Sequence, residues 1–101
     1  MGKSPFQYYH LDEKGRARKI YWTPKKIPWE RVGETYFEGA YVSTIFAGVG
    51  KNDSGPLFET LVMDPLGEVL ERLRWKDWIR AKIGHEETVK RWAQKLDSMP
   101  L

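Results

Sequence analysis

The chain has 101 residues, a formal net charge of +3 and no cysteine. This length is typical of a single domain with one modest hydrophobic core. The lack of cysteine excludes disulfides, thiolate zinc sites and cysteine nucleophiles. Aromatic residues make up 14% of the chain, and each buried aromatic removes roughly 150–250 Å² from water, so the composition predicts a folded protein.

The sequence carries no membrane signal. No stretch approaches about 18 consecutive apolar residues, and the N-terminal segment lacks the apolar region of a signal peptide. We therefore expect a soluble, cytoplasmic protein that has no membrane partner.

The N-terminal segment, residues 1–35, begins with two short strand signals. The aromatic run at 6–11 and the run at 17–22 predict two strands, and the polar residues 12–15 between them predict a turn. We therefore expect a β-hairpin at the start of the chain.

Two prolines shape the rest of this segment. Pro24 and Pro28 each remove a backbone donor and favour an extended predecessor, so residues 23–28 are predicted to form a loop. Because proline is favoured at the first helical position, residues 28–32 predict one helical turn, which Gly33 would end.

The middle of the chain, residues 36–75, predicts strands joined by turns. Its first strand has apolar side chains on both alternating faces, which is typical of a central position in a sheet. Pro and Gly occupy favoured positions in the second turn. The predicted segments are a strand at 36–49, a turn-rich loop at 48–56, a strand at 57–63, a tight turn at 64–67 and a strand at 69–75.

Residues 76–97 give the clearest helix signal. Apolar residues recur there at helical spacing, and Asp77 is placed to cap the start. Gly84 interrupts the pattern and costs about 1 kcal/mol relative to alanine, so it indicates close packing, a kink or a split into two helices. The predicted fold is α+β, with a mostly antiparallel sheet of about four strands and the C-terminal helix packed on one face.

No residue pattern supports catalysis. His85 is followed by Glu86 and Glu87, but adjacent helical residues project about 100° apart, so Glu86 does not share the face of His85. His85 lies on the apolar stripe, where a packed histidine is the more frequent role, and the sequence does not bring His10 close to it. Zinc-protease, serine-nucleophile and phosphate-loop motifs are absent. We predict no catalytic residue, no metal site and no cofactor.

Two segments combine basic and aromatic residues and are the candidate binding surfaces. Their cations can neutralise phosphates or pair with carboxylates, and aromatic faces can stack on bases or anchor an interface. The alternative is that the tryptophans pack in the core, which we favour for Trp75 and Trp78. The candidate residues are Arg16, Arg18, Lys19, Tyr21, Trp22, Lys25, Lys26, Trp29 and Arg31 in the first segment, and Arg72, Arg74, Lys76 and Arg80 in the second.

Four stretches, VSTIFAGV, PLFETLVMD, GEVLERLRW and GHEETVKRW, lie in this order along the second half of the chain. Together they resemble a recurrent group of small phage and prophage proteins of unassigned role, over roughly residues 41–92. The resemblance implies a phage-related origin and a compact α+β fold. It implies no catalytic residues, because none are established for the group.

Basic residues gather between 14 and 31 and acidic residues between 53 and 71, which predicts a polarised surface and oriented binding to a charged partner. Charge and resemblance together suggest a non-enzymatic, phage-encoded protein in the cytoplasm of an infected host cell. It would inhibit or modulate a host protein or nucleoprotein complex, of the defence or transcription machinery, by occlusion. The alternative is direct binding of nucleic acid or a nucleotide. A small nuclease-like enzyme or a virion component is less favoured, and a homo-oligomer is compatible with the sequence.

Overall fold

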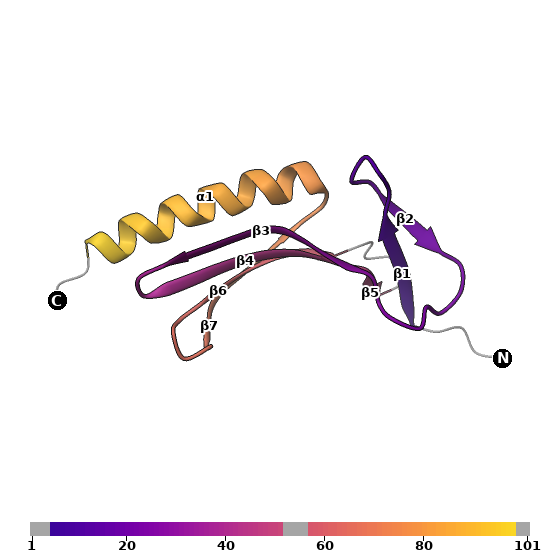
Figure 1. The fold of residues 1–101 in the computed structure, drawn as a ribbon, viewed down its shortest axis with the longest axis horizontal. Helices are drawn as coiled ribbons and strands as arrows, with labels where there is room; N and C mark the ends of the chain where they lie inside the picture. Colours follow the sequence, from indigo (N-terminus) through magenta and orange to yellow (C-terminus); the bar gives the residue numbers. More distant parts are fainter. Residues whose placement is uncertain (1–4, 52–56, 99–101) are drawn as a thin grey trace.

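The computed structural model describes residues 5–51 and 57–98, which form two antiparallel sheets and one long helix (Figure 1). The small sheet has the strand order β2-β1-β5, and the large sheet has the order β3-β4-β6-β7. The elements are β1 (Phe6–Leu11), β2 (Ala17–Ile20), β3 (Trp29–Phe37), β4 (Ala40–Ala47), β5 (Val49–Lys51), β6 (Leu57–Met63), β7 (Val69–Trp75) and α1 (Trp78–Asp97). This arrangement confirms the predicted α+β class.

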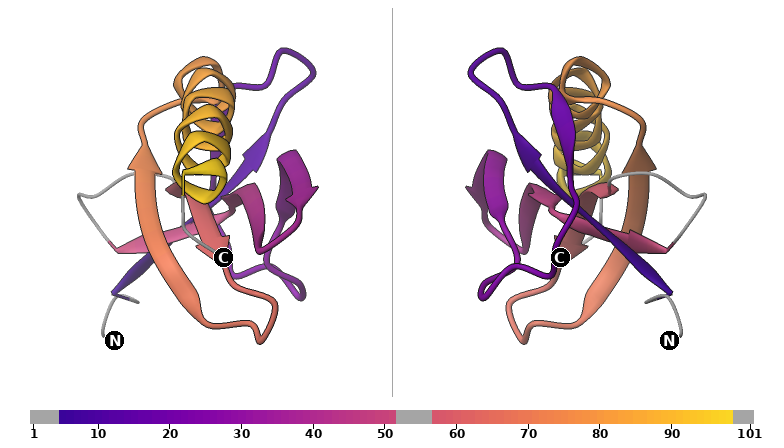
Figure 2. Two further views of the ribbon diagram at one scale, coloured as in Figure 1. Left: turned by 90° about the vertical axis from the view of Figure 1, so that its left-hand side faces the viewer. Right: turned by 90° about the vertical axis from the view of Figure 1, so that its right-hand side faces the viewer.

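The helix and the small sheet take different places around the large sheet. Helix α1 lies along one face of the twisted large sheet, as the two end-on views show (Figure 2). The small sheet lies at the end where α1 begins (Figure 1). The large sheet has the four or so strands expected, and the N-terminal hairpin and β5 make a second sheet of their own.

The side chains between the helix and the large sheet form two apolar clusters. Alternate residues of the central strand β4 face the helix, as the apolar pattern of the segment predicts. Burying one large apolar side chain stabilises the fold by roughly 1.5–3 kcal/mol, so these clusters hold α1 on the sheet. The cluster near the start of α1 contains Tyr9, Phe46, Phe58 and Ala81, and the cluster near its end contains Ala40, Val42, Val62 and Trp92.

The predicted single strand at 36–49 is wrong in its extent, because two glycines divide the segment among β3, β4 and β5. Gly39 has a φ of +96° and forms the tight turn between β3 and β4. At Gly48 the chain passes from the large sheet to the small one. A Cβ at Gly48 would lie 2.4–2.5 Å from the carbonyl oxygens of Tyr9 and Pro28, so this crossing requires glycine.

The predicted helical turn at 28–32 is also wrong, because Trp29–Phe37 is strand β3. The preference of proline for a helix start is a local effect, whereas pairing with β4 satisfies backbone groups along the whole segment. Gly33 does not end a helical turn. It lies within β3 beneath His85, where a Cβ would come within 2.9 Å of the imidazole ring.

Most of the remaining predicted elements are confirmed. The N-terminal hairpin, the strand Leu57–Met63, the tight turn after it and β7 are all present. Helix α1 is uninterrupted, so a split at Gly84 is wrong. Gly84 instead permits close packing, because a Cβ there would lie 2.3–2.5 Å from the ring of Trp75. The predicted loop at 48–56 begins with strand β5, and residues 52–56 lie outside the described residues.

Candidate functional site

Residues 21–29, named here the aromatic loop, connect β2 to the first residue of β3. The side chains of Tyr21, Trp22 and Trp29 are 86%, 72% and 58% exposed, and Ile27 is 48% exposed. The alternative that Trp22 and Trp29 pack in the core is therefore wrong. Single exposed apolar residues are common on protein surfaces, but several within one short segment are typical of an interaction site.

The cations in and beside the aromatic loop differ in how they are partnered. Lys19, Lys25 and Lys26 are exposed, and their side chains make no hydrogen bond or ion pair with any described residue. Arg31 forms an ion pair with Glu34, and its guanidinium lies 5.8 Å from the ring centroid of Trp29. The pairing with Glu34 raises the pKa of Arg31. The loop therefore presents uncompensated positive charge mainly through its lysines.

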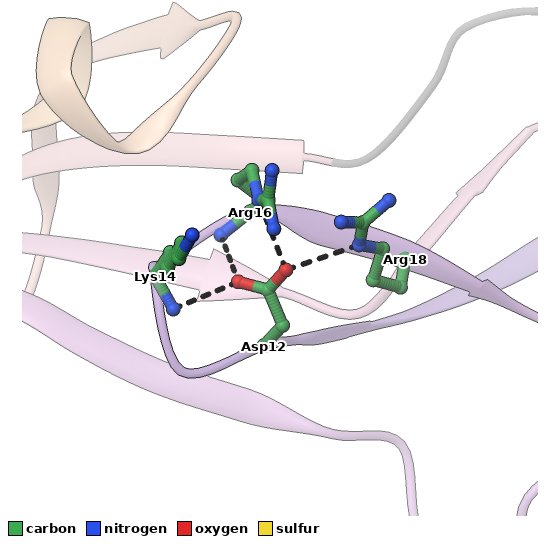
Figure 3. A network of polar contacts seen from close by, with 4 residues as sticks. All are labelled: Asp12, Lys14, Arg16 and Arg18. Carbon is green, nitrogen blue, oxygen red and sulfur yellow. Dashed lines mark hydrogen bonds and ion pairs between the residues drawn. The ribbon is translucent and has the colours of Figure 1, made fainter.

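The turn of the β1–β2 hairpin is organised by Asp12 (Figure 3). One carboxylate oxygen accepts the backbone N–H groups of Lys14 and Arg16, both at 2.9 Å. The other accepts the Nε–H groups of Arg16 at 3.1 Å and Arg18 at 3.0 Å. The backbone N–H of Arg16, followed by the guanidinium of Arg18, holds the pKa of Asp12 well below its usual range. The predicted residues Arg16 and Arg18 are thus fixed in position by one carboxylate.

This turn meets the start of α1 and forms a cleft of about 420 Å³, named here the hairpin–helix cleft. The tip of the hairpin packs on the indole of Trp78, since a Cβ at Gly15 would lie 3.4 Å from that ring. The cleft joins the two predicted basic segments through Arg16 and Lys76. It is lined by Lys14, Gly15, Arg16, Ala17, Phe58, Lys76, Asp77, Trp78 and Ile79.

The other basic residues of the second segment make ion pairs away from the aromatic loop. Arg72 and Arg74 on β7 approach the carboxylate of Glu59 at 3.8 and 3.7 Å, on the face of the large sheet opposite α1. Arg80 pairs with the helix-capping Asp77 at 2.6 Å. The structure therefore does not join these three arginines to the aromatic loop, and their neighbours compensate much of their charge.

The tryptophans of the second segment support the core, as predicted. Trp75 and Trp78 are half-buried and pack against the cluster near the start of α1. The indole N–H of Trp75 donates to the hydroxyl of Thr60 at 2.9 Å. Neither residue is an exposed anchor for a partner.

His85 is a packed core residue, as predicted. It is 3% exposed and lies between the two apolar clusters. Its Nδ1 is 2.7 Å from the hydroxyl of Thr44, and its Nε2 is 3.0 Å from the hydroxyl of Thr35. Burial lowers the pKa of His85. Both ring nitrogens are therefore occupied, which leaves no free position for a substrate or a metal.

No metal centre or membrane span emerges from the described part of the chain. Within residues 5–51 and 57–98, no three His, Asp or Glu side chains gather in a way that could hold a metal ion. Helix α1 is too polar to cross a membrane, and no other described segment forms a helix of sufficient length.

The sequence prediction missed the role of Asp12 and the cleft. A signal for Asp12 exists, because an aspartate two residues before a Lys-Gly pair commonly accepts hydrogen bonds from the backbone of its own turn. The cleft has no local signal, since its two walls are about sixty residues apart in the chain.

Comparison with known proteins adds no assignment: no protein family, no curated protein and no solved structure matches this chain.

Proposed function

We propose that the protein is a non-enzymatic binding protein that inhibits or modulates a host macromolecular complex by covering part of its surface. The observation that carries this proposal is the aromatic loop, where exposed rings stand beside lysines that have no ion-pair partner within residues 5–51 and 57–98. Large aromatic residues dominate the energetics of protein interfaces, and lysines at the rim favour an acidic partner. The complementary surface would be acidic and would have apolar pockets for Tyr21 and Trp22.

The resemblance to small phage proteins supports a role inside an infected host cell. In this chain the resembling stretches, within roughly residues 41–92, belong to β4, β6, β7 and α1. These elements build the core, whereas the aromatic loop precedes them in the chain. We infer that the shared stretches supply the scaffold and that the loop supplies the contact with the defence or transcription complex.

Affinity capture with matched variants tests the proposal. Tagged wild type, a Tyr21→Ala/Trp22→Ala variant and a Leu66→Ala/Leu70→Ala control are incubated with nuclease-treated bacterial lysate, and captured proteins are quantified by mass spectrometry. Both variants remove exposed side chains, so neither should unfold the protein. We expect a host protein that is lost with the loop variant and retained with the control. Identical captured sets for all three proteins would refute the proposal.

A second candidate function is direct binding of single-stranded nucleic acid. It is favoured by the flat exposed rings of Tyr21 and Trp22 beside Lys25 and Lys26, because stacking on aromatic rings contributes roughly 1–3 kcal/mol per base in such sites. Fluorescence anisotropy with labelled oligonucleotides, at increasing salt, would show steeply falling affinity and weaker binding by a Lys25→Glu/Lys26→Glu variant. Absence of binding at low salt would exclude this candidate.

A further inference from the structure

We propose a second binding site, distinct from the aromatic loop: the hairpin–helix cleft binds a small organic anion of mononucleotide size. The flat part of the ligand would lie against the apolar floor of the cleft. Its phosphate or carboxylate group would face Lys14, Arg16 and Lys76. Three features carry this inference, namely the shape and floor of the cleft, its uncompensated charge and its preorganisation.

The size and floor of the cleft suit a ligand with a ring. Its volume of about 420 Å³ falls within the range of roughly 300–1,000 Å³ that is usual for small-molecule sites. The floor includes Phe58, which is 1% exposed, and the half-buried indole of Trp78. Ala17 and Ile79 extend this apolar lining. Such sites are mainly apolar and have a few polar groups that fix the orientation of the ligand.

The charged residues of the cleft give it a net positive charge. Lys14 and Lys76 make no side-chain hydrogen bond or ion pair with any described residue. The guanidinium of Arg16 uses its Nε–H for Asp12, while its terminal nitrogens have no partner within the described residues. The acid that lines the cleft is Asp77, whose carboxylate is already held by Arg80.

The start of α1 is not itself the anion site. The Asp77 side chain accepts the backbone N–H of Arg80 at 2.8 Å, so the helix already carries a carboxylate at its N-terminus. Recognition of an anion therefore rests on the three cations, which come from the hairpin turn and from the residue before the cap. Charge-assisted hydrogen bonds from lysine and arginine are the usual means of holding phosphate.

The hairpin wall of the cleft is held in place before any ligand arrives. Asp12 fixes the backbone at Lys14 and Arg16 and also the Arg16 side chain (Figure 3). Gly15, with a φ of +75°, brings the turn onto the Trp78 ring. A site whose groups are already positioned loses less conformational entropy on binding, which favours affinity for a small ligand.

The experiment is a titration of the full, ¹⁵N-labelled chain with AMP, adenosine and inorganic phosphate, followed by ¹H–¹⁵N correlation spectra. We expect saturable shifts with AMP at the Trp78 indole and at the amides of Lys14, Arg16 and Ile79. Adenosine and phosphate should each bind at least about tenfold more weakly, because adenosine lacks the anionic group that faces the cations and phosphate lacks the ring that lies on the apolar floor. No saturable shift with AMP up to about 10 mM, shifts that lie elsewhere, or equal binding of adenosine would overturn the proposal.

Matched variants separate this site from the aromatic loop. Lys14→Gln/Lys76→Gln should weaken AMP binding about tenfold or more, whereas Lys25→Gln/Lys26→Gln removes the same charge and should leave it unchanged. Equal losses with both variants would indicate attraction by net charge alone and would overturn the proposal. Capture of a macromolecular partner should be weakened by Lys25→Gln/Lys26→Gln and not by Lys14→Gln/Lys76→Gln. The proposed cleft site and the proposed role of the aromatic loop can therefore be refuted independently of each other.

Discussion

The fold should lose stability in mild acid because of a chain of hydrogen bonds under α1. The Trp75 indole donates to Thr60, and the hydroxyl of Thr60 lies within hydrogen-bonding distance of Thr44. Thr60 is fully buried, so its hydrogen needs Thr44 as acceptor, and the hydrogen of Thr44 then goes to Nδ1 of His85. Nε2–H of His85 donates to Thr35. This assignment gives an acceptor to the indole hydrogen of Trp75, to the hydroxyl hydrogens of Thr60 and Thr44 and to the ring N–H of His85, and it requires a neutral imidazole.

Protonation of His85 reverses part of this chain. Nδ1 becomes a donor, so Thr44 must turn its hydrogen toward Thr60, whose own hydrogen then has no acceptor. The charged ring is also buried, and this desolvation lowers the pKa of His85, while Glu86 opposes the shift only partly. The folded pKa is thus below the unfolded value of about 6.5, so the stabilisation is complete above that pH. It falls by up to about 1.4 kcal/mol per pH unit between the unfolded and folded pKa values.

Urea denaturation measures this effect as a change in the free energy of unfolding between about pH 7.5 and about pH 5.5, a range above most carboxylate titrations. Wild type and His10→Gln, which alters the exposed histidine, should lose stability equally. His85→Gln should show a much smaller change, although its stability at neutral pH will be lower. A wild-type stability that is constant over this range, or an undiminished decline in His85→Gln, would show that the buried neutral His85 does not cause the loss of stability in acid.

Three further perturbations test the local structure. Gly84→Ala should destabilise the protein by about 1–3 kcal/mol in thermal denaturation, because the added methyl group overlaps the Trp75 ring. This loss should outweigh the better helix propensity of alanine, and a raised Tm would contradict the packing. Asp77→Ala should cost about 1 kcal/mol in urea denaturation through loss of the helix cap, and an unchanged midpoint would argue against capping. Asp12→Asn should speed amide hydrogen exchange at Lys14 and Arg16, and unaltered exchange would show that the carboxylate does not hold the turn.

The sequence predicts those parts of the fold that have a local signal. Helix α1 shows an apolar period of 3.6 residues, and Leu57–Met63 is a short apolar run between turn residues. Strand β3 has no such signal. Its side chains are exposed or half-buried, it lies at the edge of the large sheet and it contains a bulge after Arg31, so only its pairing with β4 makes it a strand.

In the candidate sites, too, some features have a local signal in the sequence and others depend on contacts between distant residues. Composition marks the aromatic loop as basic and aromatic, but the exposure of Trp22 depends on where the loop lies in the folded chain. The hairpin–helix cleft depends on a contact between Gly15 and Trp78, which no local pattern encodes. The threonines that hold His85 become neighbours only through strand pairing and helix docking. Long-range contacts therefore account for what the sequence prediction missed.

The proposed function requires that the aromatic loop, and not the core of strands and helix, contacts the partner. Calorimetry measures the Kd of the purified captured partner for wild type, Tyr21→Ala/Trp22→Ala and Leu66→Ala/Leu70→Ala. We expect the loop variant to bind about tenfold or more weakly, since buried aromatic anchors each contribute roughly 1–2 kcal/mol or more, and the control to keep an unchanged Kd. A loop variant that binds as tightly as wild type would contradict the proposed function.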